Sequence, residues 1–366
     1  MRIAYLCHCD FDGHPERSGV YRKILYQVEC WRRLGNDVAV FHISANDTGT
    51  YGTPDFAWHV FPYPRRTYVG RMRAWNSAAK SVLRWRPDVV YHRCDLWYPA
   101  IQELTRRVPL VLEINTDDLG EYRMSSRARS TYNRLTRGFL LRTSSGLVFV
   151  SAELSKLPQY DCFGKPYVVI GNGIRLEDYI VQSPTHHTCP RLVFLGSDNQ
   201  PWQGVDDILT LAGLKTDWFF DLVGVSAGSC ARQNVACHGS MCREEYEPIL
   251  GRADVAIGTL ALYRKGGAES SSLKVREYLA YGLPVVMGCK DTDFPLPVPF
   301  ILQVPNRQGS LVSEIAAVEG FVSKWMGKRV PRKDVLQIDV DPKERKRLLF
   351  LEEVLELHNE KRLHAR

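Results

Sequence analysis

The chain has 366 residues, of which 45% are hydrophobic and 24% are charged. This is the composition of a soluble globular protein, and it excludes a disordered, collagen-like or membrane-spanning chain. The length exceeds what one hydrophobic core usually serves, so we expect two domains.

The net charge of +7 is unevenly distributed. Residues 1–186 contain 25 basic and 18 acidic residues, and 21 of these basic residues are Arg. Residues 187–366 contain 23 basic and 23 acidic residues. All of the excess positive charge therefore lies in the first half. This asymmetry predicts an anionic partner for that half, such as a membrane surface, a polyanion or an acidic substrate.

The ten cysteines are scattered among strand-like and helical segments, without a CxxC pair. We therefore expect reduced thiols, and neither disulfides nor a zinc site. The sequence opens directly on a strand-like stretch and contains no apolar run of about 18 residues. These features predict a cytoplasmic protein without a transmembrane helix.

Short apolar runs of strand length alternate with helical segments along the chain. Strands are expected at residues 1–9, 37–43, 86–93, 109–115, 146–151 and 166–173, and then at 191–197, 218–224, 253–260, 283–288 and 300–304. Such alternation predicts parallel sheets covered on both faces, arranged as two doubly wound, Rossmann-like α/β domains that face a central cleft.

The segment rich in Pro, His and Thr at residues 182–190 is the expected linker. We therefore predict an N-terminal domain at 1–181, a C-terminal domain at 191–341, and a helical segment at 342–366 that packs back on the N-terminal domain. The mixed charges of this last segment, such as Glu344, Lys346 and Arg347, favour a solvent-exposed helix face.

The most informative stretch is residues 252–286, in which a strand is followed by a glycine-containing loop, three serines and a helix. Ser270, Ser271 and Ser272 are suited to capping this helix. A helix start with unpaired N–H groups binds anions such as a diphosphate. Lys274 and Arg276 add positive charge there, and Glu269 and Glu277 lie on either side of the helix start. The alternative is a surface helix of mixed charge.

Glu269 and Glu277, with seven residues between them, form an E-x7-E pattern, and their flank SLKVREYLAYGLPVV resembles the donor segment of glycosyltransferase family 4. Further segments also resemble this family of retaining enzymes: Ser18-Gly19 in the first strand–helix loop, residues 170–179, and residues 194–209. The resemblance covers nearly the whole chain.

The resemblance implies a GT-B fold and a nucleotide-diphosphate-sugar as co-substrate, with no cofactor and no metal. It places the donor in the second domain and the acceptor in the first, and it assigns Glu277 to the ribose hydroxyls and Glu269 to the transferred sugar. The N–H groups of Ser271, Ser272 and Leu273 then hold the diphosphate, and Gly19 allows a close approach to the phosphates.

The chain departs from the family pattern at three places. Ser197 and Gln203 occupy the positions of the usual diphosphate cations, so we expect other cations near the helix start to replace them: Arg264, Lys265 and Lys274. Asn115 occupies the position of a common histidine, and it is assigned with Glu269 to the catalytic centre.

Two residues near the ends of first-half strands are assigned to the acceptor, namely Asp117 and His92. For His92 the alternative is a structural role. The Asp-containing triplets at residues 10–12 and 291–293 are not expected to bind metal.

Two segments, 65–86 and 127–142, combine many Arg residues with aromatic and aliphatic ones. They fit an anionic membrane surface, and equally fit amphipathic helices that pack on the sheet with Arg in solvent. Nucleic acid binding is not expected.

Together these features predict a metal-independent, retaining glycosyltransferase acting on a glycan or lipid-linked acceptor in polysaccharide or glycoconjugate biosynthesis. Its predicted location is cytoplasmic, with peripheral binding to the inner face of a membrane as an extension. A nucleotide-sugar epimerase of similar build and a catalytically weak nucleotide-sugar-binding subunit stay open as alternatives.

Overall fold

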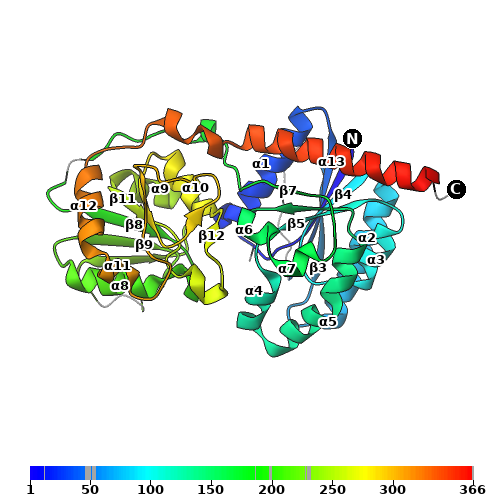
Figure 1. Ribbon diagram of the computed structural model, residues 1–366, viewed down its shortest axis with the longest axis horizontal. Helices are drawn as coiled ribbons and strands as arrows, with labels where there is room; N and C mark the ends of the chain where they lie inside the picture. The colour runs from blue at the N-terminus through cyan, green and yellow to red at the C-terminus, as the bar shows by residue number, and fades with distance from the viewer. Residues whose placement is uncertain are drawn as a thin grey trace. The chain divides into compact units, whose positions relative to one another are not determined.

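The computed structural model describes residues 1–11, 13–45, 51, 55–185, 187–197, 200–226, 228 and 232–364. The chain divides into two compact units (Figure 1). Unit 1 comprises Met1–Gly171 together with Val340–Arg366, and unit 2 comprises Asn172–Asp339.

Unit 1 is built on a seven-stranded parallel sheet with the strand order β3-β2-β1-β4-β5-β6-β7. The strands are β1 (Arg2–His8), β2 (Asp37–Ala45), β3 (Trp58–Tyr63), β4 (Val89–Arg93), β5 (Leu110–Ile114), β6 (Gly146–Phe149) and β7 (Tyr167–Val169). The order reverses between β1 and β4, which is the doubly wound arrangement expected from the sequence. In such sheets ligands bind at the carboxyl ends of the strands.

Helices cover both faces of this sheet, because successive side chains of a strand point to opposite sides. The helices of unit 1 are α1 (Gly19–Arg33), α2 (Tyr68–Trp85), α3 (Pro99–Thr105), α4 (Asp118–Ser125), α5 (Arg127–Thr143), α6 (Ala152–Ser155), α7 (Pro158–Asp161) and α13 (Val340–His364), with a 3-10 turn at Pro15–Arg17. Leu6 packs with residues of α2, α3 and α5, whereas its neighbour Tyr5 packs with residues of α1 and α13.

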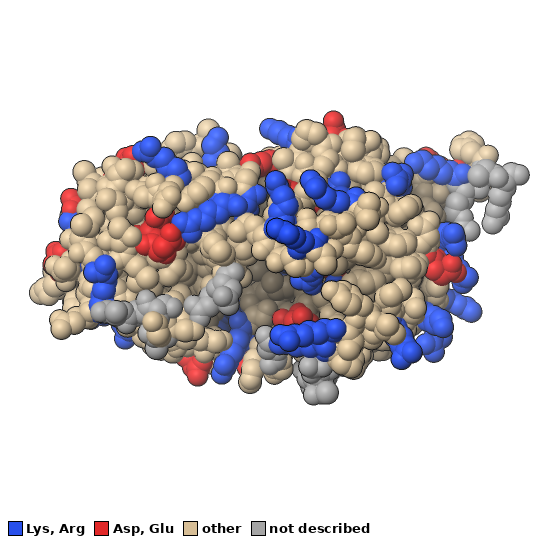
Figure 2. Space-filling model, turned by 90° about the horizontal axis from the view of Figure 1, so that it is seen from below, with Lys and Arg blue, Asp and Glu red and all other residues tan. Residues whose placement is uncertain are grey.

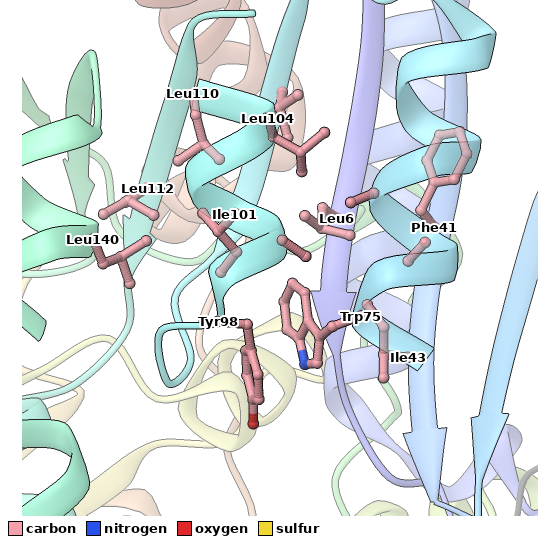
Figure 3. Close-up of a cluster of buried hydrophobic side chains, with 14 of the residues drawn as sticks. Leu6, Phe41, Ile43, Trp75, Tyr98, Ile101, Leu104, Leu110, Leu112 and Leu140 are labelled. Carbon is pink, nitrogen blue, oxygen red and sulfur yellow. The ribbon is translucent and has the colours of Figure 1, made fainter. Parts of the chain in front are cut away.

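Trp75 anchors α2 to the first of these two cores (Figure 3). Its indole is fully buried and stacks on the ring of Tyr98, with the ring centroids 4.7 Å apart. Ala74, Ala78 and Val82 lie on the same buried face of α2. The opposite face of this helix is therefore the one that meets solvent.

The C-terminal helix α13 does not carry the solvent-exposed charges that were predicted at Glu344 and Arg347. Both residues are 1% exposed and form an ion pair with each other. The indole Nε1 of Trp31 in α1 donates to Glu344 at 2.8 Å, and Arg347 lies 3.8 Å from Glu113. These charges are buried because α13 covers the sheet of unit 1, so this part of the prediction was wrong.

Unit 2 contains a six-stranded parallel sheet with the order β10-β9-β8-β11-β13-β15 and a small sheet of β12 and β14. The strands are β8 (Arg191–Leu195), β9 (Phe219–Val223), β10 (Val235–Gly239), β11 (Val255–Ile257), β12 (Glu269–Ser270), β13 (Val285–Met287), β14 (Lys290–Asp291) and β15 (Ile301–Gln303). The helices are α8 (Val205–Leu214), α9 (Arg243–Arg252), α10 (Leu273–Ala280), α11 (Ser310–Ser313) and α12 (Ile315–Trp325), with 3-10 turns at Leu176–Asp178, Pro201–Gln203, Leu262–Lys265 and Arg332–Ile338.

Residues 172–181 belong to unit 2, although the sequence assigned them to the first domain. The physical reason lies in their contacts. The backbone N–H of Asn172 donates to Oγ of Ser271, and the rings of Tyr179 and Tyr281 pack edge to face. The described residues of the expected linker, 182–185 and 187–190, form neither helix nor strand.

Cys237 is disulfide-bonded, contrary to the expectation that all thiols are reduced. Eight other cysteines are free, among them Cys7, Cys9 and Cys289. In the described part of the chain, no helix is long and apolar enough to cross a lipid bilayer.

Candidate functional site

The start of α10 lies beyond the carboxyl end of β11, at the end of a loop that also contains β12. Ser272 is the N-cap of α10, but its hydroxyl makes no capping hydrogen bond. Among the described residues, none accepts a hydrogen bond from the backbone N–H groups of Ser272 and Leu273. The helix start therefore presents donors at the sheet edge where a Rossmann-like unit binds its ligand.

The loop before α10 is fastened to Asn172. Oγ of Ser271 accepts from the backbone N–H of Asn172 at 2.7 Å and from Nη2 of Arg276 at 3.0 Å. The side-chain amide of Asn172 also donates to the carbonyl oxygen of Ser271. These bonds occupy the Ser271 side chain, so its backbone N–H is the group left for an anion.

Arg276 does not contribute charge at the helix start, as the sequence suggested, because its side chain points into the protein. It is fully buried and forms a bidentate ion pair with Asp291, at 2.7 and 2.9 Å, and a further contact with Asp293 at 2.8 Å. The Asp triplet at 291–293 thus serves as the counter-charge of this arginine. The described residues contain no cluster of three or more His, Cys, Asp or Glu that could hold a metal ion.

Glu277 lies in the middle of α10 and is 6% exposed. The phenolic hydroxyl of Tyr246 in α9 donates to its Oε1 at 2.7 Å. Glu269 lies in β12, eight residues before Glu277 along the chain, and is partly exposed. Unit 2 thus places one acidic residue before the start of α10 and a second, held by Tyr246, within the helix.

Lys274 lies beside Gln203, the residue that occupies the position of a usual diphosphate cation. Its Nζ lies 3.4 Å from Oε1 of Gln203 and 4.0 Å from the ring centre of Phe194. Burial lowers the pKa of Lys274 to about 7. The ammonium therefore lies beside Gln203 and is poised to gain or lose a proton near neutral pH.

The other two expected cations of this region are already engaged. Arg264 forms a bidentate ion pair with Asp206, at 2.9 and 2.5 Å, and also donates to the carbonyl oxygen of Pro201. Nζ of Lys265 lies 4.0 Å above the ring of Trp202. Lys274 is thus the one of the three whose ammonium reaches Gln203.

A close backbone approach explains the glycine at the end of β8. A Cβ atom on Gly196 would lie 2.2 Å from both Oε1 of Gln203 and the ring of Phe194. Because Gly196 has no side chain, Gln203 and Phe194 can both pack closely against it, and both also lie near Nζ of Lys274. Ser197, the next residue, is exposed.

In unit 1, Gly19 is the first residue of α1, and the hydroxyl of Ser18 caps this helix by accepting from the backbone N–H of Tyr21 at 3.3 Å. Asn115 follows β5 and is held by two neighbours. Its Oδ1 accepts from Nζ of Lys23 at 2.9 Å, and its amide donates to Oε2 of Glu113 at 3.1 Å.

Glu113 is the centre of a buried charge network behind Asn115. It is 0% exposed and lies 2.9 Å from Lys23, 3.4 Å from Arg93 and 3.8 Å from Arg347. Burial acts to raise the pKa of Glu113, but Lys23, Arg347 and Arg93 together hold it well below its usual range. Burial lowers the pKa of Lys23 to about 8.

The two residues assigned to the acceptor have structural contacts. Oδ1 of Asp117 caps α4 by accepting from the backbone N–H of Leu119 at 3.1 Å, and it also accepts from the amide of Gln159 at 2.7 Å. His92 is 0% exposed, and its Nδ1 lies 3.0 Å from the carbonyl oxygen of Leu6. Because β4 is central in the sheet, His92 has no face open to an acceptor in this structure, and its structural alternative is favoured.

Comparison with known proteins agrees with this geometry. Residues 18–173 match the family described as Glycosyl transferase 4-like domain. This part of the chain is similar to glycosyl transferase 4-like domains. The predicted relationship to the family is thereby confirmed for these residues, which run from the N-cap of α1 to the start of unit 2.

Solved structures similar to the whole chain include sucrose-phosphate synthase from Thermosynechococcus elongatus, with 14% identity, coverage of 100% of this chain and 99% of that one, and a TM-score of 0.69. The lipopolysaccharide outer core galactosyltransferase WaaB has 13% identity, 96% and 100% coverage, and a TM-score of 0.64. Anabaena HepE with UDP and glucose has 16% identity, 96% and 99% coverage, and a TM-score of 0.64. No curated protein sequence matches the chain. The predicted GT-B type of fold is confirmed.

The sequence did not reveal one polar cluster, which lies partly within the matched residues 18–173. His8, at the end of β1, lies 3.1 Å from Asp95 and 2.7 Å from the hydroxyl of Tyr63, and Arg71 and Tyr122 also bind Asp95. Burial acts to raise the pKa of Asp95, but His8 and Arg71 hold it well below its usual range. The signal was hidden because Arg71 belongs to a segment in which every arginine was expected in solvent.

Proposed function

We propose that the protein is a retaining, metal-independent glycosyltransferase that moves a sugar, with a hexose as the expected class, from a nucleotide-diphosphate-sugar to an acceptor. The observation that carries the proposal is the start of α10. There, N–H groups without a protein acceptor among the described residues lie between Glu269 and the Tyr246-bound Glu277. This is the arrangement that a diphosphate with a sugar on either side requires.

In this proposal the leaving diphosphate is stabilised by fixed donors. The N–H groups of Ser271, Ser272 and Leu273 and the ammonium of Lys274 face the charge that grows as the sugar leaves. Glu277 accepts hydrogen bonds from the ribose hydroxyls, and Glu269 contacts the transferred sugar near its reacting carbon. Asn115 in unit 1 is proposed as a second residue of the catalytic centre, held in place by Lys23 and Glu113.

Two structural relatives support a uridine nucleotide as the first donor to test. One contains UDP and glucose, and another, described as trehalose-6-phosphate from E. coli, is bound with UDP-2-fluoro glucose. We therefore propose UDP-glucose as the first candidate donor, bound in unit 2.

The acceptor is proposed to be a glycan or a lipid-linked sugar bound by unit 1, in the synthesis of a polysaccharide or glycoconjugate. The Lys and Arg side chains that gather over unit 1, at the right of Figure 2, support an anionic acceptor or membrane surface. We propose a cytoplasmic protein that binds peripherally to the inner face of a membrane, with no role for nucleic acid.

Donor turnover tests the proposal. Nucleotide sugars are first screened for thermal stabilisation, since a ligand at 100 times its dissociation constant adds about 2.7 kcal/mol to the free energy of unfolding. Release of nucleoside diphosphate is then measured with and without acceptor. A transferase hydrolyses the donor slowly alone and faster with an acceptor. An epimerase turns over fully with donor alone, and a binding subunit shows affinity without turnover; either result contradicts the proposal.

A further inference from the structure

A groove of about 570 Å³ lies in unit 1 between the edge strand β3 and the first half of α2. Its lining is formed by Val60, Phe61, Pro62, Tyr63, Pro64, Thr67, Val69, Gly70, Arg73, Ala74 and Ser77. Most of these residues are apolar, and β3 has a neighbouring strand only on its β2 side in the described sheet. The volume lies within the range of small-molecule sites in proteins.

The rim of the groove exposes apolar side chains that a soluble protein usually buries. Val69, which lines the groove, is 62% exposed, and the preceding residue Tyr68 is 77% exposed, although both belong to a helix that Trp75 anchors in the core. Exposed apolar surface beside a formed groove indicates a binding site rather than a folding defect. The groove is therefore suited to an apolar ligand.

The segment that lines the groove carries only positive charge. Residues 56–87 contain no Asp or Glu but seven basic residues, and Arg65 and Arg66 lie in the turn between Pro64 and Thr67, which both line the groove. Arg73 lines the groove itself, is exposed, and forms no ion pair with any described residue. An anionic group is the complement of this rim.

One end of the groove reaches the carboxyl edge of the sheet. Tyr63, which lines it, is the last residue of β3, and its hydroxyl lies 2.7 Å from Nε2 of His8, the last residue of β1. The end of the groove at Tyr63, which the turn with Arg65 and Arg66 follows in the chain, thus lies at the edge at which Rossmann-like units bind ligands.

We propose that this groove binds the hydrocarbon chain of a phosphate-bearing lipid, with the phosphate on Arg73 and the adjoining arginines. This inference rests on the proposed function only in naming the lipid as the carrier of the acceptor sugar. Binding of the lipid itself requires neither donor nor transfer, so its test stands apart from the donor assay.

The test uses n-alkyl phosphates of six, eight and ten carbons below their micelle concentrations, with inorganic phosphate and decyltrimethylammonium as comparison ligands. We expect calorimetric titration of the full chain to show affinity rising about threefold to fourfold for each CH2 that enters the groove. Inorganic phosphate and the cationic amphiphile should bind at least tenfold more weakly than decyl phosphate. Equal affinity for decyl phosphate and inorganic phosphate would overturn the proposal, as would absence of binding.

Paired variants on α2 locate the site. Val69→Asp and Arg73→Gln, which change groove residues, should weaken decyl phosphate binding about threefold to tenfold. Met72→Asp and Lys80→Gln change exposed residues of the same helix that do not line the groove, and should leave the affinity unchanged. Ser77→Phe fills the groove from its exposed side and should abolish the chain-length dependence. Equal losses in both pairs would show non-specific adsorption and overturn the proposal; unfolding curves verify that each variant is folded.

Discussion

The ammonium group of Lys274 lies 3.4 Å from Oε1 of Gln203, which itself occupies the position of a cation in the family pattern. Lys274 was predicted to replace this missing cation, and its ammonium reaches Gln203 from the start of α10. The ammonium also lies 4.0 Å from the ring centre of Phe194, and burial lowers the pKa of Lys274 to about 7. A diphosphate beside it favours the charged form and raises this pKa again.

The first prediction is therefore a pH-dependent donor affinity. The free protein loses the Lys274 proton as the pH rises through about 7, while the complex retains it, so binding takes up a proton above that pH. We expect the affinity for the nucleotide sugar to fall about tenfold between pH 7 and pH 8.5, and to change little below pH 6.5. Calorimetry in buffers of different ionisation enthalpy measures the proton uptake directly.

Two variants separate the lysine from other titrating groups. Lys274→Arg keeps a permanent charge, so its donor affinity should be independent of pH over this range. Lys274→Gln should bind weakly at every pH. A wild-type affinity that stays constant from pH 6.5 to 8.5 would show that Lys274 does not contact the donor.

The second prediction concerns Glu277. Glu277→Ala should weaken donor binding by about 1–3 kcal/mol, the cost of losing hydrogen bonds to a charged group. Tyr246→Phe removes only the hydroxyl that holds the carboxylate at 2.7 Å, so its effect should be smaller and in the same direction. Titration with the donor measures both, and an unchanged affinity in Glu277→Ala would refute the assignment of the ribose contact.

The third prediction compares two ion pairs of unit 2 that differ in burial. The side chains of Arg276 and Asp291 are 0% and 1% exposed, so Asp291→Ala should lower the free energy of unfolding by about 3–5 kcal/mol because a buried guanidinium loses a partner. The side chain of Asp206, bound to Arg264, is 56% exposed, and Asp206→Ala should cost less than about 1 kcal/mol. Urea unfolding of the two variants measures the difference; similar losses would mean that Asp293 and Ser271 suffice to hold Arg276.

The alternation of strands and helices could be predicted because buried parallel strands appear as short apolar runs, such as residues 109–115, that separate helical segments. The helix start at Ser272 could be predicted for a similar reason, since capping residues and flanking charges lie next to one another in the chain. Both patterns depend only on residues that are close in the sequence, and the strands and helices of the structure agree with them.

Long-range pairing was not predictable in the same way. Arg71, Arg276 and Arg347 have ordinary surroundings in the sequence, yet each is buried against a carboxylate. For Arg71 and Arg347 the pairing depends on the packing of a helix on the sheet, and for Arg276 on β14, the strand that bears Asp291. An arginine on a mixed-charge helix gives the same local pattern whether it lies in solvent or in a buried ion pair.

The fourth prediction tests whether the exposed basic residues at 65–80 bind an anionic membrane surface or only face solvent. Because Arg71 is buried, it is not among the residues to be changed. Arg65, Arg66, Arg73 and Lys80 are exposed, whereas Arg71 pairs with Asp95 and is left intact. Replacing these four by Gln should reduce sedimentation with phosphatidylserine-containing liposomes, by about fivefold in affinity for each charge that lies near the surface. The loss should shrink in high salt, because screening weakens the attraction.

A variant of α13 serves as the control for the effect of net charge. Arg345→Gln combined with Lys361→Gln removes two exposed basic residues from α13, and should reduce liposome binding less per charge than the variant that changes Arg65, Arg66, Arg73 and Lys80. Equal losses per charge would mean that net charge, rather than the start of α2, attracts the protein. If the wild type does not sediment with these liposomes at low salt, the basic residues of α2 form a solvated face and the acceptor is met in solution.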